Sequence, residues 1–129
     1  MFSTDEIPWP EPATTYRLIL FVLEPMDVRA GGLGRIRLPA GWYVYTGSAR
    51  RGMDARIARH LRRRKPRRWH IDYLTSDRRV LVVGVSRHRE PECRLNRRQG
   101  GLVVVPGFGA GDCRSGCGSH LRYHGASPL

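Results

Sequence analysis

An arginine, a histidine and a distant glutamate have residue types and spacing suited to phosphodiester chemistry in this 129-residue chain. Arg56 and His60 are four residues apart, so they share one flank of a helix if the segment is helical. An arginine can donate two hydrogen bonds to a phosphate. The single carboxylate of Glu92 can hold a Mg²⁺ ion that keeps most of its waters. Together they could supply the cation, the activated water and the charge stabilisation that hydrolysis needs.

A second group consists of soft metal ligands. Cys113, Cys117 and His120 are closely spaced in a glycine-rich segment, and Cys93 directly follows Glu92. Four such ligands would form a closed tetrahedral Zn²⁺ site, and Asp112 could replace one of them. The alternative is that the three cysteines are reduced thiols, with Cys93 acting as a small buried hydrophobe.

His70 and Asp72 form a third pair. On a strand, residues i and i+2 face the same way, so Asp72 would orient His70 as a base or a metal ligand. On a helix they diverge, and Asp72 would instead cap the helix while His70 lies at an interface. The sequence leaves both interpretations open.

The elements that must position these residues follow from hydrophobic periodicity and turn residues. Strands are expected over Tyr16–Leu23, Arg35–Leu38, Gly41–Gly47, Arg79–Val85 and Leu102–Val105, with the first as a buried strand. Helices are expected from an Asp54 cap to about Arg64, over Trp69–Leu74, and from Pro91 to Gln99, where Gly100 follows. The predicted fold class is α/β (α+β), a small antiparallel or mixed sheet flanked by helices.

Length and composition predict one domain. We expect an extended, proline-rich arm over residues 1–13, a single domain over 14–124 and a tail over 125–129. No apolar run is long enough to span a membrane, and the acidic N-terminus does not resemble a secretory signal. An odd number of cysteines, three, indicates a reducing compartment, so a cytoplasmic location is expected.

The net charge of +12 is concentrated in one segment. Between Arg50 and Arg98 lie seventeen of the 23 basic residues but only five of the eleven acidic ones. A concentrated basic surface is typical of proteins that bind polyanions, most often nucleic acid. Glu92 is conspicuous in this segment, although it can also form salt bridges with Arg89 or Arg97. The arginines expected to contact nucleic acid are Arg50, Arg51, Arg59, Arg63, Arg67 and Arg68.

The segment from Gly41 to His60, GWYVYTGSARRGMDARIARH, resembles the second motif and catalytic helix of the GIY-YIG nucleases. Tyr45, Thr46 and Gly47 match the family's Tyr-Ile-Gly triplet at the end of a strand. Arg56 matches the catalytic arginine, and His60 matches the position one turn later.

The rest of the resemblance covers the chain from about Tyr16 to Tyr123. Tyr16 matches the tyrosine of the first motif, where Thr14 stands in place of the family's glycine, and Glu92 falls where the metal-binding glutamate is expected. The stretches WHIDYL, ECRLNRR, VPGFG and DCRSGCGSHL are similar to the stand-alone Uri-type endonucleases.

This resemblance implies a metal-dependent endonuclease that uses Mg²⁺ or Mn²⁺ and acts on nucleic acid, with DNA favoured over RNA. The implied catalytic residues are Tyr16, Tyr45, Arg56, His60 and Glu92. Tyr16 would orient or deprotonate water if a nearby cation lowered its pKa. Two alternatives are a nucleic-acid-binding module that does not cut, and a zinc-stabilised interaction domain.

Overall fold

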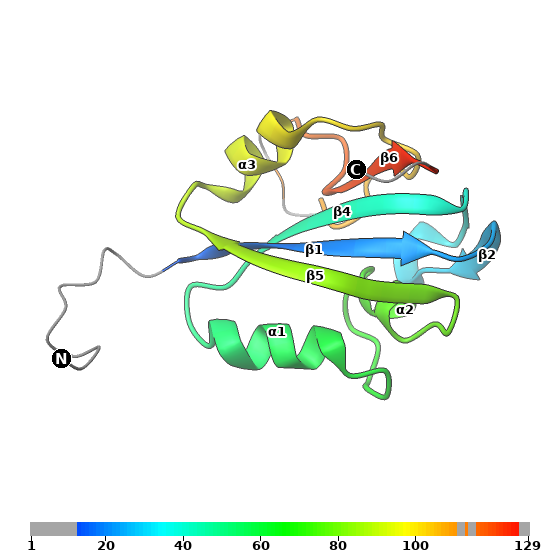
Figure 1. Ribbon diagram of the computed structural model, residues 1–129, viewed down its shortest axis with the longest axis horizontal. Helices are drawn as coiled ribbons and strands as arrows, with labels where there is room; N and C mark the ends of the chain where they lie inside the picture. The colour runs from blue at the N-terminus through cyan, green and yellow to red at the C-terminus, as the bar shows by residue number, and fades with distance from the viewer. Residues whose placement is uncertain (1–12, 111–112, 114–115, 127–129) are drawn as a thin grey trace, which may run out of the picture.

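The computed structural model describes residues 13–110, 113 and 116–126. Asp112, residues 1–12 of the expected arm and residues 127–129 of the expected tail lie outside the described residues. The main sheet has four antiparallel strands in the order β5-β1-β4-β6, and β2 and β3 form a separate two-stranded sheet. The strands are β1 (Thr15–Val22), β2 (Met26–Arg29), β3 (Arg35–Leu38), β4 (Gly41–Ser48), β5 (Val80–His88) and β6 (Leu121–Gly125). The helices of the described residues are α1 (Met53–Leu61), α2 (Asp72–Thr75) and α3 (Glu92–Gln99), with a 3₁₀ turn at Gly31–Leu33. The expected α+β class is confirmed (Figure 1).

Strand β1 is apolar on both faces, but only one face is fully buried. Leu18, Leu20 and Val22 belong to the core, together with Ile57 of α1 and Leu74 of α2. Because side chains alternate along a strand, the intervening apolar residues point to the other face and are only half-buried. The sequence-based interpretation of this run as a buried strand therefore holds for one face only.

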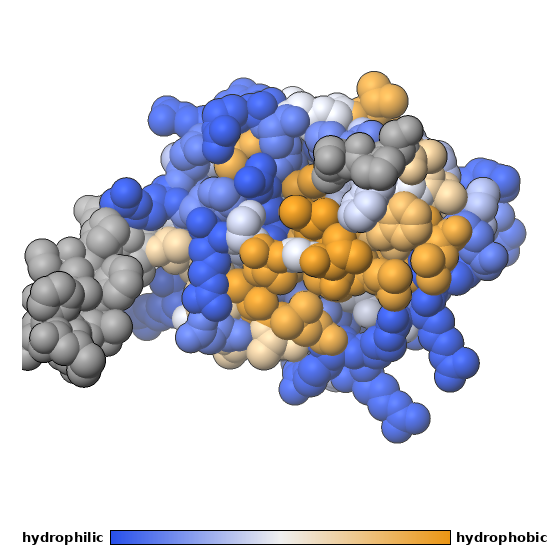
Figure 2. Space-filling model, in the orientation of Figure 1, coloured by the Kyte–Doolittle hydropathy of each residue, from blue (hydrophilic) through white to orange (hydrophobic). Residues whose placement is uncertain are grey.

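The opposite face of the sheet presents apolar side chains to the surface. Figure 2 shows these side chains gathered over the strands in the orientation of Figure 1. On this face Leu81 of β5 lies opposite the half-buried Phe21 of β1, and Leu81 is exposed. No helix among the described residues is long and apolar enough to cross a membrane.

The helix boundaries follow local chemistry, with one correction. Helix α1 begins after Gly52, which adopts a left-handed φ of 66° and offers no side-chain cap. Asp54 was expected to be the cap, but it lies within the first turn and pairs with Arg87 of β5 at 2.6 Å. The helix ends at Leu61, a turn earlier than predicted. Helix α3 begins after Pro91 and ends before a glycine with φ of 70°, as the sequence indicated.

Two strands were not predicted, and one prediction was wrong. β2 and β6 alternate apolar and polar residues, which is the pattern of a half-buried strand, but they are only four and five residues long and were not among the expected strands. The strand expected over Leu102–Val105 is absent, and Leu102 makes only an isolated bridge to Tyr123 of β6. The edge beside β4 is instead occupied by β6, which comes from the end of the described chain.

Three strand ends meet at one end of the main sheet. β1 begins there, while β4 and β5 end there, so that Tyr16 lies opposite Gly47 on one side and Arg87 on the other. The chain then enters α1 after β4 and α3 after β5 (Figure 1). This end of the sheet therefore collects side chains from β1, β4, α1 and α3.

Candidate functional site

A cleft of about 720 Å³ lies at this end of the sheet. Its walls come from the starts of β1 and α3, the end of β4, helix α1, the segment before α2 and the C-terminal segment. Four of the five residues expected to be catalytic line it directly, and the fifth, His60, lies buried behind Tyr16. The lining residues include Tyr16, Tyr45, Gly47, Ser48, Arg56, Arg68, Trp69, His70, Glu92, Cys93, Cys113 and His120.

Tyr16 and His60 form a buried pair. The Tyr16 hydroxyl lies 2.5 Å from His60 Nε2, and His60 is only 1 % exposed. Burial, with Lys65 nearby, lowers the pKa of His60 to about 4, so the imidazole is neutral at pH 7. Burial also raises the pKa of Tyr16 to about 12, although the Arg56 guanidinium acts in the opposite direction. The protein's own residues therefore do not meet the condition for Tyr16 to deprotonate water, because desolvation outweighs the lowering of its pKa by Arg56.

The glycine of the Tyr-X-Gly triplet leaves room for the Tyr16 ring. Gly47 pairs with Tyr16 across the sheet, and a Cβ atom at Gly47 would lie 2.6 Å from both Cζ and Oη of Tyr16. Tyr45 packs beside Tyr16 with ring centroids 6.4 Å apart, and burial raises the pKa of Tyr45 well above its usual range. Both tyrosines are consequently neutral phenols at pH 7.

Arg56 is held at the cleft wall by contacts with β4 and with Trp69. Its guanidinium donates a hydrogen bond to the Ser48 carbonyl at 3.0 Å, and its Cζ lies 4.5 Å from the centroid of the Trp69 ring. Trp69 is 37 % exposed and also receives Arg59, at 4.3 Å. Stacking of this kind orients an arginine without neutralising it. Trp69 therefore positions the cation, a role that the sequence did not identify.

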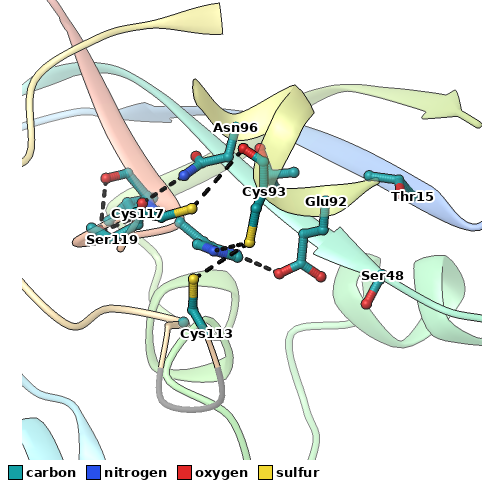
Figure 3. A network of polar contacts seen from close by, with 12 residues as sticks. Thr15, Ser48, Glu92, Cys93, Asn96, Cys113, Cys117 and Ser119 are labelled. Carbon is teal, nitrogen blue, oxygen red and sulfur yellow. Dashed lines mark hydrogen bonds and ion pairs between the residues drawn. The ribbon is translucent and has the colours of Figure 1, made fainter. Parts of the chain in front are cut away.

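Glu92 has a partner that the sequence did not predict. Its carboxylate forms an ion pair with His120 Nδ1 (Figure 3). Burial would raise the pKa of Glu92, but hydrogen bonds from His120 and Ser48 hold it below its ordinary value. Burial would likewise lower the pKa of His120, and the bond to Glu92 outweighs it, giving a value of about 9. The Glu92 side chain keeps 25 % of its surface exposed to the cleft.

The four residues expected to be soft ligands lie together beside this ion pair. The ligand atoms of Cys93, Cys113, Cys117 and His120 all lie within 4.8 Å of one another, and this cluster could hold a metal ion. Cys93 Sγ is 3.4 Å from Cys113 Sγ and 3.8 Å from His120 Nε2, and the three cysteines form no disulfide. Sulfurs bound to one tetrahedral Zn²⁺ at about 2.3 Å would be roughly 3.8 Å apart. The cluster is thus compact enough for one ion.

His70 and Asp72 do not form a pair. Asp72 is fully buried and accepts hydrogen bonds from Arg59 at 2.7 Å and from the backbone of Arg68 and Trp69. His70 lines the cleft and accepts a hydrogen bond from the Gly109 backbone at Nδ1, 3.0 Å away. The strand interpretation, in which Asp72 would orient His70, is not met, because the segment before α2 is a turn. Asp72 is not the helix cap either, since Ile71 occupies the cap position and Asp72 lies in the first turn, where it holds the preceding backbone.

The six arginines expected to contact nucleic acid divide into two groups. Arg59 is committed to Asp72, and Arg63 donates to the carbonyls of Asp77 and Val80, so these two stabilise the fold. The other four have exposed side chains, and one of them lines the cleft: Arg50, Arg51, Arg67 and Arg68. The sequence could not separate the groups, because the partners of Arg59 and Arg63 are set by the tertiary structure.

Comparison with known proteins gives a family but no activity. No curated protein and no solved structure matches this chain. A family model described as a domain of unknown function, DUF123, matches residues 15–128, which is nearly the entire described region. The chain therefore belongs to the DUF123 family.

Proposed function

We propose that this protein is a metal-dependent endonuclease of the GIY-YIG type. The observation that carries the proposal is the convergence on one cleft of Tyr16, Arg56 and Glu92, which come from β1, α1 and α3. The resemblance noted in the sequence implies catalytic roles for these same residues. A cleft combining a phenol, a guanidinium and a carboxylate beside an exposed basic surface suits a phosphodiester substrate.

Each residue has a role that its contacts support. Arg56, oriented by Trp69, donates hydrogen bonds to the phosphate and stabilises charge on its oxygens. The Tyr16 hydroxyl contacts the attacking water, and the neutral imidazole of His60 sets its direction through Nε2. Tyr45 packs against Tyr16 and restricts the movement of its ring.

Glu92 is the residue proposed to hold Mg²⁺ or Mn²⁺. Among the described residues that line the cleft, it is the one carboxylate, and its partly exposed side chain suits an ion that keeps most of its waters. When bound, this ion would neutralise phosphate charge and make a bound water more acidic. Arg56 and Arg68 would supply the remaining positive charge from the cleft wall.

We further propose that the ion in the cluster of Cys93, Cys113, Cys117 and His120 is Zn²⁺. Three thiolates and one imidazole are the ligand set of closed structural zinc sites. Thiolate ligands require reducing conditions, so the proposed location is the cytoplasm.

A paired cleavage assay tests the proposal. Wild-type protein, Arg56→Ala and Glu92→Ala are incubated with Mg²⁺ or Mn²⁺ and a panel of linear, branched and flapped DNA, with matched RNA. We expect cleavage by the wild type, with DNA preferred, and a loss of about 10²–10³-fold in each variant, the range for removing one preorganised charge-stabilising group. Arg35→Ala serves as the matched control, because Arg35 is an exposed arginine on the separate β2–β3 sheet.

The outcomes separate the alternatives. If the wild type binds nucleic acid but does not cleave it, the protein is a binding module and not an endonuclease. Cleavage that persists in Glu92→Ala would refute the assigned metal ligand. If the wild type neither binds nor cleaves nucleic acid, the remaining alternative is the zinc-stabilised interaction domain.

A further inference from the structure

We infer that a Zn²⁺ ion in the Cys93, Cys113, Cys117 and His120 cluster positions Glu92 at the cleft, acting through the imidazole of His120. The link between the zinc site and Glu92 stands on the described contacts alone, whereas its consequence for an ion in the cleft rests on the proposed function.

The two ring nitrogens of His120 contact different partners. Its Nε2 lies on the side of the thiols, 3.8 Å from Cys93 Sγ, while its Nδ1 pairs with the Glu92 carboxylate. Metal-binding histidines commonly donate their second ring N–H to a carboxylate, which fixes the tautomer and the ring orientation. His120 is 1 % exposed, so the ring has little freedom to turn away from either partner.

Helix α3 carries both Glu92, which pairs with His120, and Cys93, which belongs to the cluster. Glu92 and Cys93 are consecutive residues in its first turn, so one side chain enters the cleft while the next reaches the cluster. The C-terminal segment is tied to the same helix through Asn96 Nδ2, which donates to the Ser119 carbonyl at 2.8 Å (Figure 3). A metal joining Cys93 to His120 would close this ring of contacts and lock the start of α3.

The consequence concerns the direction of the Glu92 carboxylate. One oxygen, Oε2, is engaged by His120, and Ser48 at the end of β4 also donates to the carboxylate. Figure 3 shows the Glu92 carboxylate on the same side of α3 as Ser48, with one oxygen in the ion pair. With the imidazole fixed by zinc, the carboxylate cannot rotate freely, so it presents a constant lone-pair geometry to an ion in the cleft.

The first measurement is the zinc content of the purified chain, followed by its affinity for Zn²⁺ in competition with a chromophoric chelator. We expect one Zn²⁺ per chain and its loss in Cys117→Ser. Glu92→Ala removes the partner of His120 but none of the four ligands, so its Zn²⁺ affinity should fall by about 10–100-fold. Glu90→Ala is the matched control, because Glu90 pairs with Arg98 and lies just before the same helix.

The second measurement tests whether His120 affects the binding of a metal ion at Glu92. His120→Cys replaces the imidazole by a thiolate, which keeps four zinc ligands but removes the N–H that engages Glu92. Zinc-loaded His120→Cys should bind Mn²⁺ about tenfold more weakly than the wild type by calorimetry without nucleic acid. His70→Asn, a change in the same cleft, should bind Mn²⁺ as the wild type does. If His120→Cys fails to fold, the wild type stripped of zinc replaces it, with the same expected weakening.

Each result decides a separate claim. A chain without zinc, or a Glu92→Ala variant that binds Zn²⁺ as tightly as Glu90→Ala, overturns the inference whatever the cleavage assay gives. Unchanged Mn²⁺ affinity in zinc-loaded His120→Cys, or in the zinc-free wild type, overturns the positioning role. Absence of Mn²⁺ binding by the wild type contradicts the proposed function, while the zinc measurements still decide the link to Glu92.

Discussion

Replacing Gly47 by Ala tests the geometry at the centre of the cleft. The new Cβ would lie 2.6 Å from Cζ and Oη of Tyr16, whereas carbon contacts are comfortable at about 3.5–4.0 Å. The Tyr16 ring would therefore have to move by roughly 1 Å. It has little room to do so, because it is buried, hydrogen-bonded to His60 and packed on Tyr45.

Two effects should follow from this displacement. Overpacking of this kind costs about 1–3 kcal/mol in the free energy of unfolding. The 2.5 Å contact between Tyr16 and His60 would be broken or distorted, and a misplacement near 1 Å can lower the rate of a chemical step by about 10²-fold. Urea denaturation measures the first effect, and single-turnover cleavage measures the second.

Gly32→Ala provides the control. No atom lies within 4 Å of a Cβ placed at Gly32, so this change adds the same methyl group without a clash. If Gly47→Ala unfolds at the same urea concentration as Gly32→Ala, the predicted clash with Tyr16 does not occur. Lost stability with unaltered cleavage would instead show that the displaced tyrosine takes no part in the reaction.

Three further predictions concern stability and charge. The pKa of His60 is about 4 in the folded chain and ordinarily 6.5, so between these values only the unfolded state takes up a proton. The free energy of unfolding should therefore drop by about 3 kcal/mol from pH 7 to pH 4. Urea denaturation across this pH range should show a smaller drop in the free energy of unfolding for His60→Asn than for the wild type. An equal drop in both proteins would contradict the lowered pKa of His60. Asp72→Asn breaks a buried ion pair and should cost about 3–5 kcal/mol by thermal melting. Asp27→Asn, at an exposed pair, should cost less than about 1 kcal/mol, and equal losses would be inconsistent with the burial argument. Double replacement of Arg50 and Arg51 by Ala should weaken DNA binding and flatten its salt dependence without shifting the melting temperature, and an unchanged salt slope would remove these arginines from the interface.

Much of the secondary structure could be predicted from local pattern. The apolar run of β1, the alternating aromatic residues of β4 and the Pro–Gly limits of α3 all identify their elements within a few residues. β2 and β6 were not predicted, because each is too short for its alternation to stand out and its strand conformation depends on hydrogen bonds to β3 or β4. Where a partner strand supplies the stability, local composition is a poor guide.

The sequence by itself determined which residue types were available, namely the Tyr-X-Gly triplet, the Arg–His pair, Glu92 and the thiols, and it located the excess positive charge. Only the tertiary structure decided their partners. Tyr16 meets His60 across 44 positions, and Cys93 meets His120 across 27. The physical reason is one of range: propensity and periodicity act over a few residues, whereas sheet register and core packing determine contacts between distant segments. The pairing of Glu92 with His120, on which the link between the two proposed metal sites depends, is a product of that packing alone.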